Sequence, residues 1–437
     1  MFWLELIIVL AMIFWGVRKG GTFLAMVGGI GMFIFTFILH VTPSEPPVTV
    51  ILIMIAVIIA AAAMQAAGGL DYLVNVAEGI LRKNPKHITI LAPVVAYIFS
   101  FMCGTGHIVY SLLPVINEIA IENGVRPERP ISASIISSQQ ALNACPISAA
   151  TAAMIGFLAV FPNFSLTTLL IVMIPATFLG TIAAALSVYK RGLELEDDPE
   201  YQARVAAGLV QDFKAQTAEK RDFDKNAKRS VAIFLLSMLV IVILGAVPAI
   251  RPVFGEDASL GMTDAIQMFM LIAGALIIIF CKVDSEKVLD VPMFKTGMFA
   301  VVLAFGLCWL VNTFIGDQST WISENMSALT DQYPWIFIIA TFIVGAITTS
   351  QASTTMIMIP IGIALGLPLN VLLAGFVVTT ANYVIPASGQ CVAALAFDTA
   401  GTTKIGKFIL NHSYMLPGLV CTVVSVVVAL ALGALFA

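Results

Sequence analysis

The sequence predicts an all-α polytopic membrane protein with ten transmembrane helices and two re-entrant hairpins, arranged as two inverted-topology repeats. Three observations predict this fold class. Only 11% of the 437 residues are charged, against roughly 25% in a soluble domain, and the mean hydropathy is +0.99. Apolar segments near the ~20 residues that a membrane-crossing helix needs recur along the whole chain. Finally, a polar interruption breaks an apolar segment once in each half of the chain.

Ten apolar segments are expected to cross the bilayer, five in each half. The first is followed by Arg18 and Lys19 and has no basic residue before it, the reverse of a signal peptide, so we expect a retained span. The spans are predicted near 3–17, 21–39, 48–66, 131–160 and 165–188 in the first half, and near 230–250, 263–282, 295–314, 368–397 and 408–435 in the second.

Two further apolar segments, 87–120 and 334–366, are broken near the middle, at 103–107 and 348–355. We expect each to be a re-entrant hairpin rather than a crossing. Backbone that leaves the helix at membrane depth must be shielded by protein or water. The hairpins are therefore expected to lie inside the protein.

The remaining segments complete the order of elements. Segments 67–86 and 315–333 precede the hairpins and mix apolar with charged residues, as interfacial helices do. Because five crossings is an odd number, the second half enters the membrane upside down relative to the first. The chain is therefore predicted to divide into a first repeat (1–189), a linker (190–229) and an inverted second repeat (230–437).

The distribution of basic residues gives an independent prediction of topology. With the N-terminus outside, 21 of the 22 Lys and Arg residues fall on one side of the membrane, and only Arg251 falls opposite. By the positive-inside tendency that side is the cytoplasm, so both termini are expected to be periplasmic. Hairpin 87–120 then enters from the cytoplasm and hairpin 334–366 from the periplasm. A full crossing by either hairpin would scatter the basic residues over both faces, so their placement favours the hairpins.

The linker is the one long polar segment of the chain. Asp198 and Pro199 are typical of an N-cap and a first helical position, and they predict a helix over Glu200–Phe213. We expect a solvated connecting helix in the cytoplasm. A regulatory docking role is the alternative.

The two polar interruptions have related sequences. The first contains Gly104-Thr105-Gly106-His107 and the second runs from Ser350 to Thr355; ten residues separate Gly104 from Pro114, and ten separate Ser350 from Pro360. A later span in each half contains an Asn followed by Pro and Ser, in 143–148 and in 382–388. Helix-breaking polar residues at matching positions of two halves indicate a transport site.

A helix broken at membrane depth offers free N–H groups, which favour anions, and free carbonyl groups, which can coordinate cations. No Lys or Arg lies deep in a predicted span, so a charged substrate would meet neutral donors and helix ends. A dicarboxylate would match the two related breaks, one break for each carboxylate. The predicted substrate-binding residues are Gly104, Thr105, Gly106, His107, Asn143, Pro146, Ser148, Ser350, Gln351, Ser353, Thr354, Asn382, Pro386 and Ser388.

Packing is the alternative role for any single hydroxyl, because Ser and Thr in membrane helices often bond to carbonyls one turn back. His107 could bind substrate or shuttle a proton, but no acidic residue neighbours it in sequence. Asn143 and Asn382 could line the site or satisfy broken backbone. Arg126 and Arg129 flank the cytoplasmic entrance of the fourth span, where they are either a gate that attracts anions or ordinary interfacial anchors.

Soluble-enzyme motifs are absent from the sequence: it has no phosphate-binding loop ending in Lys-Ser/Thr, no His-Glu-x-x-His and no Gly-x-Ser-x-Gly. ATP is therefore not expected to be the direct energy source, and no enzyme activity is expected. The six cysteines have no paired spacing, so neither a disulfide framework nor a metal site is predicted. The expected partners are a small substrate and the lipid bilayer, with no cofactor and no nucleic acid.

Several short stretches, spread along nearly the whole chain, together carry a family resemblance: Ala66–Asp71, Arg82–Lys86, Cys103–His107, Arg126–Pro130, Ser350–Ala352 and Gly401–Phe408. In these stretches the chain resembles the Dcu family of anaerobic C4-dicarboxylate exchangers. The resemblance implies exchange of fumarate, malate or aspartate for succinate across a bacterial inner membrane, and the inverted repeats with hairpins of the wider ion-transporter superfamily. It also implies a homodimer, an elevator-like motion and a role for Arg129.

The chain departs from this family in the second break, where Ile385-Pro386-Ala387-Ser388 stands in place of Leu-Pro-Thr-Tyr. The preference among dicarboxylates is therefore left open. We expect a secondary transporter that works by alternating access, with spans one to three of each half as scaffold and the hairpins with the broken spans as the moving part. The alternative is an anion channel or uniporter, whose breaks would form a selectivity filter. A membrane-embedded enzyme is disfavoured because no His, Asp or Glu cluster lies at one depth.

Overall fold

The computed structural model describes residues 1–19, 21–161, 164–208, 210, 224–254, 258–386, 388–406 and 411–436. Within these ranges the regular secondary structure is helical apart from one two-stranded antiparallel hairpin and one isolated bridge. The prediction of an all-helical fold is therefore confirmed. The helices of the first half are α1 (Phe2–Lys19), α2 (Gly21–Phe33) with a π-helical end (Ile34–Ile38), α3 (Val48–Ala66), α4 (Gly69–Lys83), α5 (Ile88–Cys103), α6 (Val109–Glu122), α7 (Glu128–Ala144), α8 (Ala149–Leu158) and α9 (Leu166–Val188).

The linker contributes one helix, and the second half then repeats the alternation of long and broken helices. Short 3₁₀ turns cover Pro85–His87, Gly106–Ile108, Leu195–Asp197, Pro248–Ile250 and Ala381–Tyr383. The remaining elements are α10 (Pro199–Ala206), α11 (Lys225–Ala246), β1 (Val253–Phe254), β2 (Ala258–Ser259), α12 (Met262–Cys281), α13 (Lys287–Asp290), α14 (Pro292–Leu303), a π-helical segment η7 (Ala304–Cys308), α15 (Trp309–Gln332), α16 (Trp335–Thr348), α17 (Gln351–Ala364), α18 (Leu369–Val378), α19 (Gly389–Phe397) and α20 (Met415–Gly433).

Eight helical stretches of the described chain are long and apolar enough to cross a membrane. They include 128–158, which joins α7 and α8, and 292–318, which runs from α14 into α15. The helices α1, α2, α16, α17 and α18 belong to shorter apolar segments. A multi-pass membrane protein is therefore confirmed, whereas the count of ten spans and the assignment of α5–α6 and α16–α17 as hairpins stay predictions.

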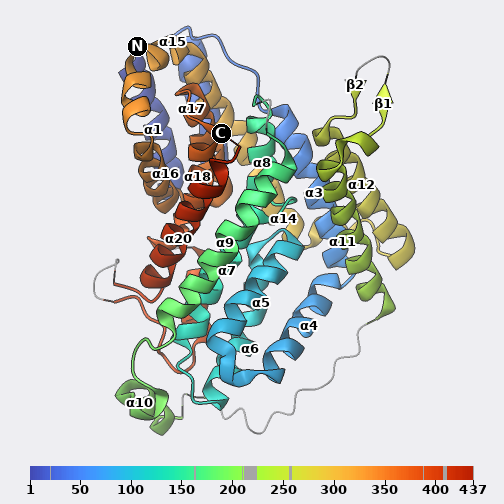
Figure 1. Ribbon diagram of the computed structural model, residues 1–437, viewed down its shortest axis with the longest axis vertical. Coiled ribbons are helices and arrows are strands. Elements are labelled where there is room, and N and C mark those ends of the chain that lie inside the picture. The colour runs from blue at the N-terminus through green and yellow to red at the C-terminus, as the bar shows by residue number, and fades with distance from the viewer. Residues whose placement is uncertain are drawn as a thin grey trace.

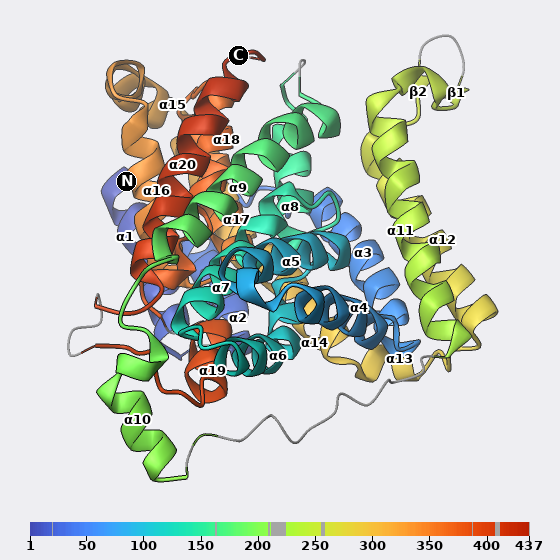
Figure 2. The same ribbon diagram turned by 60° about the horizontal axis from the view of Figure 1, so that its bottom comes forward.

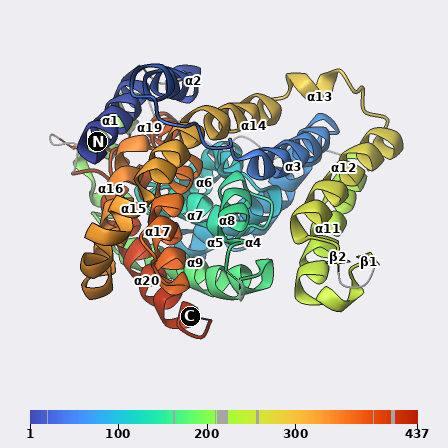
Figure 3. The same ribbon diagram turned by 90° about the horizontal axis from the view of Figure 1, so that it is seen from above.

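The two chain termini lie toward one end of the molecule, and the linker helix α10 lies at the opposite end (Figure 1). In the same view α16 and α17 lie in the half that contains the termini, and α5 and α6 lie in the half nearer to α10. Helices α11 and α12 form a pair at one side, where α12 packs on α3 and α11 packs on α4 (Figures 2 and 3). The two polar interruptions thus belong to helix pairs from opposite ends of the molecule.

Helix α7 is rich in polar residues and lies in the middle of the protein, packed against α5 and α9. Its buried side chains include four serines, two glutamines and one asparagine. Polar side chains inside a membrane protein are costly unless they bond to one another or line a water-filled cavity. The buried polar side chains of α7 therefore indicate a polar site in the middle of the protein.

Three predicted boundaries are wrong. The segment 315–333 is not a separate helix, because α15 runs without interruption to Gln332; no proline or glycine pair breaks it, whereas Gly68, at a φ of +78°, separates α3 from α4. The last span begins at Met415 rather than near 408. In the linker, Asp198 caps α10 as predicted, but the helix ends at Ala206 before Gly208, whose φ of +68° stops it. Residues 211–223, which include the rest of the predicted helix, lie outside the described ranges.

Candidate functional site

The two interruptions have the same backbone geometry. In the first, α5 ends at Gly104 with a φ of +66°, and the extended residue Thr105 accepts a hydrogen bond from the amide of His107 at 3.2 Å. In the second, α16 ends at Thr349 with a φ of +51°, and Ser350 accepts from the amide of Ser353 at 3.3 Å. The structural equivalent of Gly104 is therefore Thr349 rather than Ser350, so the predicted pairing by ten-residue spacing is one residue out of register.

The second helix of each broken span begins with the same kind of cap. Ser148 begins α8 and accepts from the amide of Thr151 at 3.1 Å, while Ser388 begins α19 and accepts from the amide of Cys391 at 3.4 Å. A Ser or Thr oxygen in this position satisfies one of the free N–H groups of the first helical turn. At the two interruptions and in the two broken spans, four helical segments thus begin with a hydroxyl cap: the 106–122 segment, α8, α17 and α19.

All four capping residues line one cavity of about 370 Å³, a volume within the usual range of small-molecule sites. The helices that carry these caps pack in two pairs, α6 on α19 and α17 on α8. Each pair combines one helix from each half of the chain. A third wall comes from α3 and α14, through Met54, Val57, Met293 and Thr296.

Most predicted site residues meet in this cavity. Those that line it are Gly104, Thr105, Gly106, His107, Ser148, Ser350, Gln351, Asn382 and Ser388. Those that do not are Asn143, Pro146, Ser353, Thr354 and Pro386. The prediction missed several lining residues, of which Tyr110, Gln139, Thr296, Thr349 and Gln390 are polar.

Three of the predicted residues that do not line the cavity, Asn143, Ser353 and Thr354, form hydrogen bonds within the protein. Asn143 donates to the carbonyls of Phe376 and Val377 at 3.1 and 3.2 Å, and its own oxygen accepts from Gln351. The Ser353 hydroxyl donates to Ser350 at 2.7 Å. Thr354 bonds to Thr348 at 2.8 Å. These contacts hold α7, α17 and α18 together and fix the position of the second interruption.

The cavity lining contains no Asp, Glu, Lys or Arg side chain among the described residues. Its polar groups are hydroxyls, amides, the imidazole of His107 and the helix starts. The partial positive charge of a helix N-terminus favours an anion there. The site is therefore suited to an anion that is held by neutral dipoles.

A second cavity of about 280 Å³ adjoins the first, and Thr105, His107, Tyr110, Met293 and Thr296 line both. It extends to Gln65 at the end of α3 and Leu70 at the start of α4. The imidazole of His107 stacks on the ring of Tyr110, with 5.7 Å between the ring centroids. His107 therefore stands where the main cavity continues toward α4.

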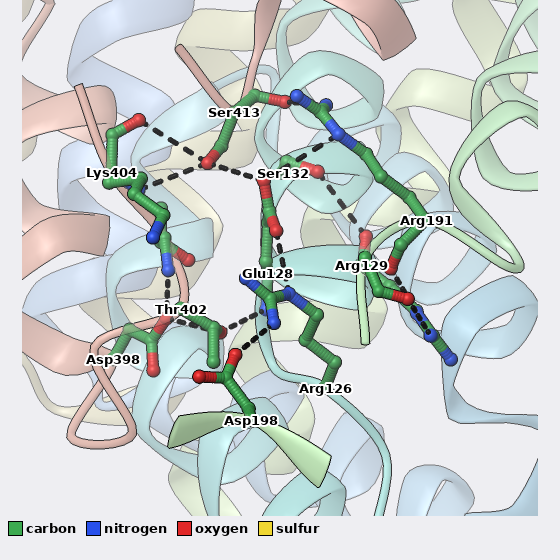
Figure 4. Close-up of polar contacts among 12 residues, drawn as sticks. Arg126, Glu128, Arg129, Ser132, Arg191, Asp198, Asp398, Thr402, Lys404 and Ser413 are labelled. Carbon is green, nitrogen blue, oxygen red and sulfur yellow. Dashed lines mark hydrogen bonds and ion pairs between the residues drawn. The ribbon is translucent and has the colours of Figure 1, made fainter. Parts of the chain in front are cut away.

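Arg126 and Arg129 lie outside both cavities, in a cluster of ion pairs at the linker end of the molecule (Figure 4). Arg126 bonds to Glu128 at 2.8 Å and to Asp198. Arg129 bonds to Glu194 at 3.0 Å and to the backbone carbonyl of Arg191 at 2.7 Å. Their predicted role as a gate or in anion attraction stays a prediction, and in this arrangement both guanidinium groups are engaged.

The cluster also fixes the loop before α20. Ser413 donates to Glu128 at 2.7 Å, and Arg191 donates to the carbonyl of Ser413 at 2.7 Å. Asp398 accepts from the hydroxyl of Thr402 at 2.8 Å. Burial raises the pKa of Asp398 above its ordinary value. The cluster joins three segments far apart in sequence: the start of α7, the linker and the chain between α19 and α20.

The sequence predicts neither a disulfide framework nor a metal site. All six cysteines are buried and free. In the described part of the chain no group of three or more His, Cys, Asp or Glu side chains is placed to hold a metal ion.

Capped helix starts that meet at an uncharged cavity inside an all-helical membrane protein define the class of protein as a membrane transporter. Comparisons with known proteins agree. The chain matches, over residues 1–437, the family model described as anaerobic C4-dicarboxylate membrane transporter, and it belongs to that family. It is a transporter and not an enzyme.

Relatives extend over nearly the whole chain. The C4-dicarboxylate transporter DcuA of Wolinella succinogenes is 39% identical over 422 residues, which cover 97% of this chain and 96% of the relative. The anaerobic C4-dicarboxylate transporter DcuB of Escherichia coli is 36% identical over 434 residues, which cover 98% and 97%. Among solved structures, MtrF of Neisseria gonorrhoeae aligns with a TM-score of 0.55 at 14% identity, over 92% of this chain and 84% of MtrF. That likeness concerns the fold alone.

Proposed function

We propose that this protein exchanges C4-dicarboxylates, such as fumarate, malate or aspartate against succinate, across a bacterial inner membrane by alternating access. One observation carries the proposal: the four capped helix starts at Thr105, Ser148, Ser350 and Ser388 line a single cavity that has no Lys or Arg side chain among the described residues. Membership of the C4-dicarboxylate transporter family supports the substrate class.

The pairing of the helix starts suggests how a dicarboxylate binds. One carboxylate lies against the starts of the 106–122 segment and α19, and the other lies against the starts of α8 and α17. A partly buried helix terminus stabilises an opposite charge by up to about 2 kcal/mol, so two termini offset part of the cost of desolvating one carboxylate. Each carboxylate is then held by one helix from each half of the chain, rather than by one interruption alone.

This neutral site has a consequence for exchange. A fixed Arg or Lys would leave a buried unpaired charge in the empty carrier, which is costly. Dipoles and hydroxyls carry no such penalty, but in the empty carrier these donors lack the anion that they bind in the loaded carrier. We infer that the loaded carrier crosses between its two states more readily than the empty one, which favours exchange over net flux.

The wider architecture is part of the same proposal. The repeats 1–189 and 230–437 form an inverted pair of five spans and one hairpin each, joined by the linker 190–229. Helices α1–α3 and α11–α15 form the scaffold, and the hairpins with the broken helices α7–α8 and α18–α19 move against it as an elevator. The predicted substrate residues Asn143, Pro146, Ser353, Thr354 and Pro386 support the moving part from behind the cavity. The protein is proposed to be a homodimer with both termini in the periplasm.

Counterflow in proteoliposomes tests the exchange mechanism. Vesicles that contain the purified protein are preloaded with unlabelled succinate, and uptake of labelled fumarate or aspartate is compared with that in vesicles loaded with buffer. We expect internal succinate to accelerate uptake. Flux that is independent of internal succinate would refute exchange and favour a channel or uniporter.

A further inference from the structure

We propose that Gln139 and Gln390 form a carboxamide clamp that binds one carboxylate of the substrate and makes this end of the cavity selective for a carboxylate over a neutral amide. This inference rests on the proposed function, since it takes a dicarboxylate as the substrate. Gln139 lies on α7 and Gln390 in the first turn of α19, and both line the main cavity. Both side chains are almost fully buried, with 7% and 5% of their surface exposed.

The side-chain amides of Gln139 and Gln390 both lie beside Gly106, at the position that the Cβ atom of a larger residue would occupy. A Cβ atom at Gly106 would lie 2.7 Å from Nε2 of Gln139 and 3.2 Å from Nε2 of Gln390. Both donor groups therefore occupy the space beside the start of the 106–122 helical segment. The hydroxyl caps Thr105 and Ser388 belong to the same pair of helix starts. This concentration of donors is what a carboxylate requires.

The orientation of Gln139 is set from behind. Its oxygen accepts a hydrogen bond from the amide of Asn382 at 3.3 Å. No hydrogen bond within the described residues uses Nε2 of Gln139 or the amide of Gln390. With its acceptor end occupied, Gln139 presents its NH₂ group, which can donate to a carboxylate oxygen but does not accept from an amide N–H. Gln390 adds a second donor, and the discrimination against an amide rests on Gln139. Asn382 is thus a positioning residue.

The opposite pair of helix starts, those of α8 and α17, has no such pair of free side-chain amide donors in the described part of the chain. Its one carboxamide is Gln351, whose Nε2 already donates to Asn143. Asn143 in turn uses its own NH₂ group on the carbonyls of Phe376 and Val377. The donors there are engaged in holding three helices together. The two ends of the substrate are therefore recognised differently, and the carboxylate at the Gln139 end is the one under strict selection.

Binding of succinate and of its monoamide, succinamate, tests the clamp. The purified variants Gln139→Leu and Gln390→Leu are compared with wild type by isothermal titration and by the KM and maximal rate of counterflow. Loss of a hydrogen bond to a charged group predicts that the Kd and KM for succinate rise about ten- to a hundredfold. We expect the preference for succinate over succinamate to shrink by a similar factor, with little change in the maximal rate.

The matched control is Gln140→Leu. Gln140 is the next residue of α7 and is also buried, but it faces Thr380 and does not line the cavity. Thr380 keeps a second bond to the carbonyl of Val377 at 3.0 Å, so this variant should fold and keep the wild-type preference. Gly106→Ala is a second test variant. The three atoms nearest to its Cβ belong to the movable side-chain amides of Gln139 and Gln390, so this variant should displace both amides without unfolding the protein.

The outcomes separate the two proposals. If the preference for succinate is unchanged in Gln139→Leu and in Gly106→Ala, the clamp is refuted. If Gln140→Leu reduces the preference as much as Gln139→Leu, the effect comes from packing of α7 and the clamp is again refuted. A wild type that binds succinate but shows no counterflow would contradict the exchange mechanism alone, since the titrations still decide on the clamp.

Discussion

The ion pair between Arg126 and Asp198 is expected to stabilise the fold far more than the nearby pair between Lys404 and Glu200. Both pairs join the linker to the rest of the protein, and the two acidic residues are two positions apart. In the first pair the side chains are 7% and 10% exposed, whereas in the second they are 53% and 55% exposed. Loss of one partner from a buried pair costs about 3–5 kcal/mol, and an exposed pair contributes about 0–1 kcal/mol.

The other contacts of Asp198 and Arg126 reduce the loss of stability expected for Asp198→Asn. The Asn side chain still caps α10, because Asn is as good an N-cap as Asp. Arg126 also keeps its bond to Glu128 at 2.8 Å, so its charge is not left alone. We therefore expect a loss of about 2–3 kcal/mol, toward the lower end of the buried-pair range. Glu200→Gln should cost less than about 0.5 kcal/mol.

The pH dependence of this effect has a definite sign. Burial alone would raise the pKa of Asp198, but the bonds from Arg126 and from the amides of Tyr201 and Glu200 outweigh it and lower the pKa below the ordinary value. A carboxylate with a lowered pKa contributes its full stability at neutral pH and loses it only as the pH falls through its ordinary range near 4. The difference between wild type and Asp198→Asn should therefore be constant between pH 6 and pH 8.

Thermal unfolding of the purified variants in one detergent measures the effect, with ligand-free protein at pH 7. A lower midpoint for Asp198→Asn than for Glu200→Gln is expected. A double-mutant cycle with Arg126→Gln should show coupling between Arg126 and Asp198. Equal midpoints for the two single variants would refute the reasoning, because the buried pair would then contribute no more than the exposed one.

Two further predictions concern packing and protonation. A Cβ at Gly28 of α2 would lie 2.2 Å from the carbonyl oxygen of Gly306, a backbone atom that cannot rotate away. Gly28→Ala should therefore lower the free energy of unfolding by about 1–3 kcal/mol. The control Gly29→Ala, whose Cβ meets nothing within 4 Å, should not lower the unfolding midpoint. His412 accepts from the amide of Tyr414 through Nδ1, and burial, helped by nearby Arg191, lowers its pKa. The neutral ring is thereby favoured, so stability should decline as the pH falls below about 6.5, and His412→Asn should flatten this decline; an unchanged pH profile would contradict the assignment.

Local sequence chemistry accounts for the parts of the fold that could be predicted. Apolar runs specify helices because every backbone group in lipid must bond within its own segment, and Gly104 and Pro146 interrupt such runs visibly. The continuation of α15 to Gln332 was missed, because a mixture of apolar and charged residues does not reveal whether a helix ends. Thr349 was missed for another reason: a positive φ at a β-branched residue is imposed by the surrounding structure and has no sequence signal.

In the site, too, some residues could be predicted from their local sequence, whereas others depend on how the helices pack together. Thr105, Ser148, Ser350 and Ser388 could be predicted, because capping residues occur next to the breaks that they serve. Gln139 and Gln390 could not, since each stands in an ordinary helical position and gains its role only when α7 and α19 approach Gly106. The one available signal was the cost of polar side chains in a membrane helix. Applied to the buried face of α7, that signal would have selected Gln139 together with Gln140 and Asn143.

In the proposed mechanism, the charged side chains and the anion-binding groups are separate for a physical reason. The buried arginines Arg126 and Arg129 are already engaged with carboxylates, so an anion that bound there would have to displace Glu128, Asp198 or Glu194. The donors around the cavity have no such competitors and carry no net charge. A site of this kind binds an anion without holding it against release, because the attraction falls off within the first helical turn. Rapid release on either side of the membrane is what an exchanger requires, and neutral donors at helix starts meet that requirement better than an arginine in the cavity.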